Sequence, residues 1–204
     1  LSFKANAVSI DSKAQTLSVT DAVVSSGDLS AKLQLQGKQI LDNPVFTGQL
    51  KAAPFNLKNV LTIFGKPFTK TDPNALQKVS LDIKLSATSS SVILKPLTLH
   101  LDDSTIQGNF AVTNFSIPTV RFDLAVDNFN LDHYLPSFAS TDSVASTPAT
   151  ATTVSANAPS NTMRQSDVAG SLRVGQLTAG KIILNQMSTQ ITLKDGLLNL
   201  DPFN

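Results

Sequence analysis

The chain has 204 residues, a formal net charge of +1 and no cysteine, and 15% of its residues are charged, fewer than the roughly 25% of an average globular domain. The near-neutral charge and the wide separation of Arg121, Arg164 and Arg173 argue against a nucleic-acid-binding surface. The lack of cysteine excludes disulfide bonds and thiolate metal sites.

The composition also favours β-structure. All acidic residues are aspartate, and glutamate, a strong helix former, is absent. Threonine, valine, isoleucine and phenylalanine, which suit half-buried strands, are plentiful. No apolar run is long enough to cross a membrane as a helix. Because Leu1 lies inside an alternating pattern and Asn204 follows a hairpin pattern, we expect the chain to be part of a longer protein.

Apolar and polar residues alternate in successive segments, which in chain order are residues 27–37, 44–52, 79–85, 97–101, 106–112 and 120–126. Successive side chains of a strand point to opposite faces, so each segment predicts a strand with one apolar and one polar face. Turn-forming residues separate these segments at 42–44, 102–103, 114–118 and 194–196. The sequence therefore predicts an all-β fold with a few short helices, built as an antiparallel meander.

A repeated unit strengthens this prediction. Residues 44–57 match residues 118–131 at constant spacing, and residues 27–35 match residues 104–112, so the unit is a strand, a turn, a second strand and a short helical turn. Asn56 and Asn130 are predicted to cap those turns at their N-termini. A further short helix is predicted at residues 72–77, with Pro73 at its first position.

Residues 139–169 differ from the rest because they are mostly serine, threonine, alanine, asparagine and proline, with little that could form a core. Such a composition predicts a flexible linker. We therefore expect three regions, which are a repeated β-region at 1–138, the linker at 139–169 and a further β-repeat at 170–204, continuing the sheet.

No motif for catalysis, phosphate binding or metal binding is present in the sequence. Strand alternation places His100 on a polar face, and His133 lies in a predicted exposed turn. His100 with Asp102 makes only two metal ligands, which is too few for a site. The aspartates at 102, 103, 123 and 127 are better explained by turns and polar strand faces than by a hydrolytic carboxylate pair. We predict no catalytic residue, no metal, no cofactor and no enzymatic activity.

The remaining candidate site is the apolar face of the strands. Two interpretations are open, because periodicity does not tell whether such a face meets protein or lipid. One is the core of a closed β-sandwich, and the other is an open groove for acyl chains. The residues predicted to line this face are Leu29, Leu33, Phe46, Leu50, Leu81, Ile83, Leu99, Leu101, Phe110, Val112, Phe122 and Leu124.

Residues 121–124 and 130–136, which read Arg-Phe-Asp-Leu and Asn-Leu-Asp-His-Tyr-Leu-Pro, resemble a stretch of the AsmA family. Residues 101–112 are similar to the strand pair that precedes it, and residues 170–202 are similar to the ending of the family pattern. His133 departs from that pattern, in which arginine is usual. The family's N-terminal membrane anchor and the strands beyond Asn204 have no counterpart in this sequence.

The resemblance implies a periplasmic protein of Gram-negative bacteria that is anchored to the inner membrane and linked to outer-membrane biogenesis. It also implies kinship with TamB-like and bridge-like lipid transfer proteins, whose repeated β-units form a taco-shaped groove. It favours the open groove over the sandwich, with phospholipid acyl chains as ligand. A second hypothesis is a scaffold whose edge strands pair with outer-membrane proteins or other envelope proteins. A hydrolase is the least favoured hypothesis.

Overall fold

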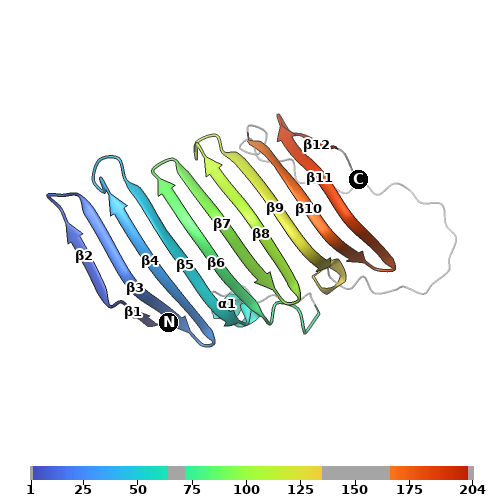
Figure 1. Ribbon diagram of the computed structural model, residues 1–204, viewed down its shortest axis with the longest axis horizontal. Coiled ribbons are helices and arrows are strands. Elements are labelled where there is room, and N and C mark those ends of the chain that lie inside the picture. The colour runs from blue at the N-terminus through green and yellow to red at the C-terminus, as the bar shows by residue number, and fades with distance from the viewer. Residues whose placement is uncertain (1, 64–71, 135–165, 202–204) are drawn as a thin grey trace.

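The computed structural model describes residues 2–63, 72–134 and 166–201. These residues form a single curved sheet (Figure 1). Its first seven strands are β1 (Ser2–Lys4), β2 (Ala7–Asp11), β3 (Thr16–Ser26), β4 (Leu29–Lys38), β5 (Val45–Phe55), β6 (Val79–Thr88) and β7 (Ser91–Leu101). The other five are β8 (Ser104–Thr113), β9 (Thr119–Asn130), β10 (Asp167–Ala179), β11 (Ile182–Lys194) and β12 (Leu197–Asp201).

Neighbouring strands in the sheet follow the order of the chain from β3 to β12. β2 and β1 lie one after the other along the outer edge of β3, where β2 pairs with residues 16–20 and β1 with residues 23–25. Among the described residues, the edge strands β2 and β12 pair with the sheet on one side only, so the sheet is not closed into a barrel. The alternation of the sequence thus correctly predicted an all-β meander, and the alternative of a two-sheet sandwich is wrong for the described part of the chain.

One strand pair departs from the antiparallel prediction, because β10 runs parallel to β9. A parallel neighbour requires a connection that returns the chain to the end of the sheet from which the previous strand began. Residues 135–165, which make this connection, lie outside the described residues. They include most of the linker predicted at 139–169, but the last residues of that segment, 167–169, already belong to β10.

The two predicted helical turns are present. α1 (Leu57–Ile63) follows β5, and the Asn56 side chain accepts hydrogen bonds from the backbone N–H groups of Lys58 at 3.0 Å and Asn59 at 3.3 Å. The 3₁₀ helix η1 (Leu131–His133) follows β9, and the Asn130 side chain accepts from the Asp132 N–H group at 3.1 Å. Both asparagines therefore cap a helix N-terminus, as predicted.

The helix predicted at residues 72–77 is wrong, because this segment forms turns. Leu76 has a φ of +63°, a left-handed conformation that a continuing helix excludes. The N–H groups of Leu76 and Gln77 donate instead to the Asp102 carboxylate, at 2.7 and 2.9 Å. A contact across 25 residues thus replaces the local helix that Pro73 suggested.

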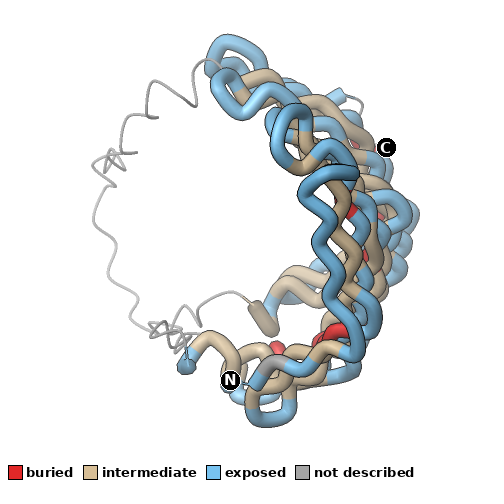
Figure 2. Tube along the Cα trace, turned by 90° about the vertical axis from the view of Figure 1, so that its left-hand side faces the viewer, coloured by how far each residue is buried: buried red, intermediate tan, exposed pale blue. Residues whose placement is uncertain are grey.

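The strands are bent along their length, so that the sheet has the shape of a trough in Figure 2. Irregular pairing occurs along the strands at Val19/Ala22, Ile83/Leu85 and Leu94/Leu97, where bulges interrupt the ladder. Bulges bend and twist the strands that carry them. At Gly108, a Cβ atom would lie 1.9 Å from the carbonyl oxygen of Asp123 on β9, so only glycine permits this close approach of two backbones.

Candidate functional site

The strand register joins the apolar side chains into continuous rows across the sheet. Residues directly opposite one another on paired strands project from the same face. One row passes through the middle of every strand from β3 to β11, and its members are Ala22, Leu33, Leu50, Ile83, Leu97, Gly108, Leu124, Leu172 and Thr189.

Further rows run beside this one on the same face. Towards the start of β4, the row consists of Val24, Ala31, Ala52, Leu81, Leu99, Ile106, Val126, Val174 and Met187. On the other side, the row consists of Val8, Val19, Leu35, Gly48, Leu85, Leu94, Phe110, Phe122, Gly170, Ile191 and Leu200. The last long row consists of Ile10, Leu17, Gly37, Phe46, Ala87, Val92, Val112, Val120, Val168, Leu193 and Leu198.

These rows contain no charged residue, and together they form what we call the apolar face. All of the predicted lining residues lie on it, including Leu29, opposite Ser26, and Leu101, opposite Val79, at one margin. The prediction missed the members from β10 and β11, such as Leu172, Val174 and Met187. The same period-two alternation resumes at Gly170 and would have identified Leu172 and Val174 as further members.

The apolar face is the inner side of the trough. Every strand side chain that is buried projects from this face, and these side chains are Ala22, Ala31, Val79, Ile83, Ser104, Val174, Met187 and Thr189. Side chains on the inside of a bend crowd together, whereas those on the outside spread apart. Crowding alone does not seal the face, because no large side chain among the described residues is less than 2% exposed. A conventional core would contain such residues.

Two phenylalanine rings lie against glycines of neighbouring strands on this face. A Cβ atom on Gly170 would lie 2.5 Å from the Phe122 ring, and one on Gly37 would lie 2.9 Å from the Phe46 ring. The glycines therefore give the rings space to lie down on the sheet.

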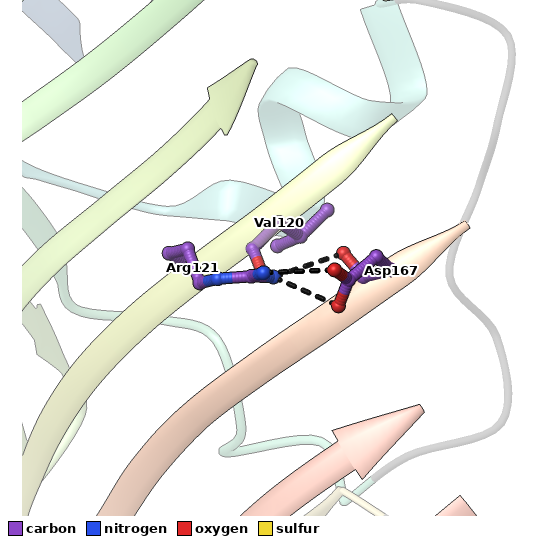
Figure 3. A network of polar contacts seen from close by, with 3 residues as sticks. All are labelled: Val120, Arg121 and Asp167. Carbon is purple, nitrogen blue, oxygen red and sulfur yellow. Dashed lines mark hydrogen bonds and ion pairs between the residues drawn. The ribbon is translucent and has the colours of Figure 1, made fainter. Parts of the chain in front are cut away.

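The opposite face is polar, and ion pairs link neighbouring strands there. Arg121 on β9 pairs with Asp167 on β10 through both guanidinium NH₂ groups, with nitrogen–oxygen distances of 3.0 and 2.9 Å (Figure 3). Arg173 lies 2.9 Å from Asp123, which also accepts from the Ser171 hydroxyl at 2.5 Å. Both pairs span the parallel β9–β10 junction. The hydrogen bond from Arg121 lowers the pKa of Asp167 below its usual range.

A second group of polar contacts on this face surrounds Asp82. Its carboxylate lies 2.9 Å from the Lys51 ammonium and accepts from the Gln49 amide at 2.8 Å. The hydrogen bond from Lys51, more than that from Gln49, lowers the pKa of Asp82. Lys51 and Asp82 line a hollow of about 480 Å³ together with Lys32 and His100. The outer face is therefore a solvated surface with partnered charges.

The model of the AsmA family matches residues 4–204, which is almost the entire chain. The chain belongs to the AsmA family. No curated protein and no solved structure gave a significant match. AsmA membership suggests a role in the cell envelope or in outer-membrane biogenesis, and the apolar trough is the part of this AsmA chain that stands out as a binding surface.

The histidines and aspartates considered for catalysis do not come together in this AsmA chain. His100 is exposed on the polar face, where its Nδ1 atom lies 3.3 Å from the Thr105 hydroxyl. Asp127 accepts hydrogen bonds from the N–H groups of Thr105 and Asn128, at 2.7 and 2.6 Å. Partial burial would raise the pKa of Asp127, but these bonds outweigh it and lower the pKa. His133 lies in η1, as the sequence predicted, but its side chain is partly buried and not exposed.

Asp102 has a structural role that its position in the sequence does not reveal. Besides the N–H groups of Leu76 and Gln77, its carboxylate accepts from the Lys78 N–H at 3.0 Å and the Tyr134 hydroxyl at 2.9 Å. Burial acts to raise the pKa of Asp102, but these hydrogen bonds outweigh it, and the pKa is lowered. Burial and the bond to Asp102 both raise the pKa of Tyr134. Asp102 thus fastens the turn before β6 and the end of η1 to the β7–β8 hairpin.

The described residues offer neither a metal site nor a membrane-spanning helix. No group of three or more histidine, cysteine, aspartate or glutamate side chains there could hold a metal ion. No helix in the same part of the chain has the length and apolar character needed to span a bilayer.

Proposed function

We propose that this chain is a non-enzymatic lipid-binding part of an AsmA protein, whose trough holds the acyl chains of phospholipids. The observation that carries the proposal is the apolar face itself, which is continuous from β2 to β12, is free of charge and belongs to a single sheet with no second sheet of described residues packed on it. We further propose that the trough lies in the periplasm, that the full-length protein is anchored to the inner membrane, and that it serves outer-membrane biogenesis by binding or conducting phospholipid.

The energetics support an acyl chain as ligand. Transfer of a methylene group from water to an apolar surface is favourable by about 0.8 kcal/mol. A lipid tail in an aqueous compartment would therefore lose this stabilisation along its length, and a continuous apolar trough restores it. Such binding needs neither a cofactor nor a reactive group. It also stabilises the protein, since the ligand covers side chains that would otherwise contact water.

The length of the trough supports binding of more than one tail. Neighbouring strands are about 4.8 Å apart, so the path of strands from β1 to β12 makes a trough roughly 50 Å long. The hydrocarbon core of a bilayer, which contains two layers of tails, is about 30 Å thick. One tail therefore spans only part of the trough, and several lipids would be needed to fill it.

A pair of charge substitutions on β8 tests the proposal. Phe110→Asp places a carboxylate on the apolar face, whereas Gln107→Asp places one on the exposed polar face of the same strand. We expect the protein to co-purify with phospholipid, detected by native mass spectrometry, and Phe110→Asp to reduce the bound lipid strongly while Gln107→Asp does not. Thermal unfolding of both variants separates loss of binding from loss of fold. A wild-type protein that carries no lipid and takes up none from vesicles would contradict the proposal.

The scaffold hypothesis makes a different prediction. A scaffold for client proteins would use the unpaired edges of β2 and β12, and charge substitutions in the trough would leave client binding intact. Cross-linkers placed at the edges and in the trough distinguish the two hypotheses. The scaffold predicts protein adducts at the edge positions, and lipid binding predicts lipid adducts at the trough positions.

A further inference from the structure

The hollow of about 480 Å³ on the outer face lies over the adjacent strands β4, β5, β6 and β7 (Figure 1). Sites for small molecules usually have volumes of about 300–1,000 Å³, so the hollow has room for a small ligand. Its polar lining residues are Lys32, Lys51, Asp82 and His100 together with Ser30, Ser80 and Thr98.

Two lysines of this hollow lie directly opposite one another. Lys32 on β4 and Lys51 on β5 are register partners in an antiparallel strand pair. Like charges in such positions repel and lower the stability of a sheet. Asp82, the next residue in the same row, forms an ion pair with Lys51 at 2.9 Å. Lys32 has no ion-pair or hydrogen-bond partner among the described residues, so it is an exception to the partnered charges of the outer face.

The hydroxyl groups of the hollow are also without partners. Those of Ser30, Ser80 and Thr98 make no hydrogen bond to another described residue. Each hydroxyl group can donate one hydrogen bond, and a lysine ammonium group can donate three. The hollow therefore presents free hydrogen-bond donors beside a positive charge that no described carboxylate balances.

The surplus of positive charge extends beyond the two opposite lysines. Lys84 projects from the same face of β6 as Asp82, and its charge also acts on that carboxylate. Asp82 is the only acidic residue among the described residues that line the hollow. The whole chain has a formal net charge of only +1, so this concentration of lysines is local. Such a surface favours an anion and disfavours a metal cation.

We infer that this hollow binds a phosphate group, with Lys32 as its main electrostatic contact and the neighbouring hydroxyl groups as further donors. A phosphate group is anionic at pH 7 and has several acceptor oxygens. Lysine binds such a group as a point charge. The phosphate can belong to a phospholipid headgroup or be free in solution, since both sources share this chemistry. The inference does not rest on lipid binding in the trough, because the hollow lies on the opposite face of the sheet.

Titration with inorganic phosphate at constant ionic strength, followed by NMR chemical shifts, tests the site. Lys32→Gln should weaken phosphate binding at least about tenfold, because it removes a charged hydrogen-bond donor. Lys38→Gln is the matched control. It removes the same charge from the exposed outer face of the same strand, about 20 Å away and outside the hollow, and should leave binding unchanged.

Asp82→Asn should have the opposite effect. It removes the acidic residue of the hollow and frees Lys51, so we expect phosphate to bind several-fold more tightly. This gain cannot arise from damage to the fold. Thermal unfolding without phosphate provides a second check, since Lys32→Gln removes the repulsion with Lys51 and should not lower the melting temperature.

Vesicles of phosphatidylglycerol distinguish the two sources of phosphate. If a headgroup binds, Lys32→Gln should reduce co-sedimentation with the vesicles and Lys38→Gln should not. If free phosphate binds, both variants should sediment as the wild type does, while Lys32→Gln alone loses inorganic phosphate. A wild-type chain that binds neither probe, or equal effects of the two substitutions on both, would overturn the inference. Phe110→Asp should still bind phosphate, so a failure of the trough to bind lipid would be recognised separately.

Discussion

At the scale of single residues, polar contacts outside the trough hold turns and strand ends of this protein in place. Asp102 is the clearest case, since its carboxylate binds three successive N–H groups of residues 76–78 and the hydroxyl of Tyr134. Charged acceptors make stronger hydrogen bonds than neutral ones. The turn before β6 and the end of η1 therefore depend on one side chain, which no local pattern in the sequence identified.

We predict that Asp102→Asn destabilises the protein by about 1–3 kcal/mol at pH 7, because it weakens hydrogen bonds to a charged group and turns one acceptor into a donor. Asp103→Asn, at the exposed next residue, should change the free energy of unfolding by less than about 0.5 kcal/mol. Urea denaturation of the three proteins measures both values. Equal effects of the two substitutions would show that the contacts of Asp102 do not support the fold.

The same substitution should alter the acid sensitivity of the protein. The pKa of Asp102 is lowered in the folded protein, whereas the unfolded chain has a value of about 3.9. Its contribution to stability is therefore complete above the unfolded pKa and is lost as the pH falls through the folded pKa. We expect the stability difference between wild type and Asp102→Asn to shrink between about pH 5 and pH 2. A difference that is constant over this range would contradict the assignment.

At the scale of strands, the trough depends on close approach between backbones. Gly108→Ala should weaken the pairing of β8 and β9, because its Cβ atom would collide with the Asp123 carbonyl group. Gly27→Ala is the control, since Gly27 has a φ of +61° but nothing within 4 Å of the added atom. There we expect only the conformational cost of about 1–2 kcal/mol. Thermal unfolding should place Gly108→Ala clearly below Gly27→Ala, and the reverse order would show that the strands can move apart cheaply.

Much of this level of structure could be predicted from the sequence. Alternation fixed the strands and the face on which residues such as Phe46, Leu50 and Phe122 lie, because burial of one face imposes a period of two. The two helical turns could be predicted from Asn56 and Asn130, because N-terminal capping depends on local sequence. The parallel pairing of β10 with β9 was not predictable, since alternation is the same in parallel and antiparallel strands. The prediction of a helix at residues 72–77 failed for a related reason. The Asp102 carboxylate, which binds the N–H groups of this turn, is distant in sequence.

At the scale of the whole molecule, the central feature is a single layer whose inner face is apolar. The alternation of the sequence left both a sandwich core and an open groove possible, because the same side chains would serve either, and only the family resemblance favoured the groove. The strand order decided between them by placing all described strands in one sheet. A single layer leaves Leu50, Phe110 and Phe122 only partly buried. Unlike a buried core, this surface gains stability from an added apolar ligand.

Photo-cross-linking at two adjacent residues of β5 tests this account most directly. Phe46 projects into the trough, whereas Thr47 is exposed on the polar face, so a photoreactive residue at each position samples one face of the same strand. With the protein in its native envelope, we predict phospholipid adducts from position 46 and none from position 47. Equal labelling at both positions, or adducts from position 47 alone, would contradict the claim that the inner face of the trough binds lipid.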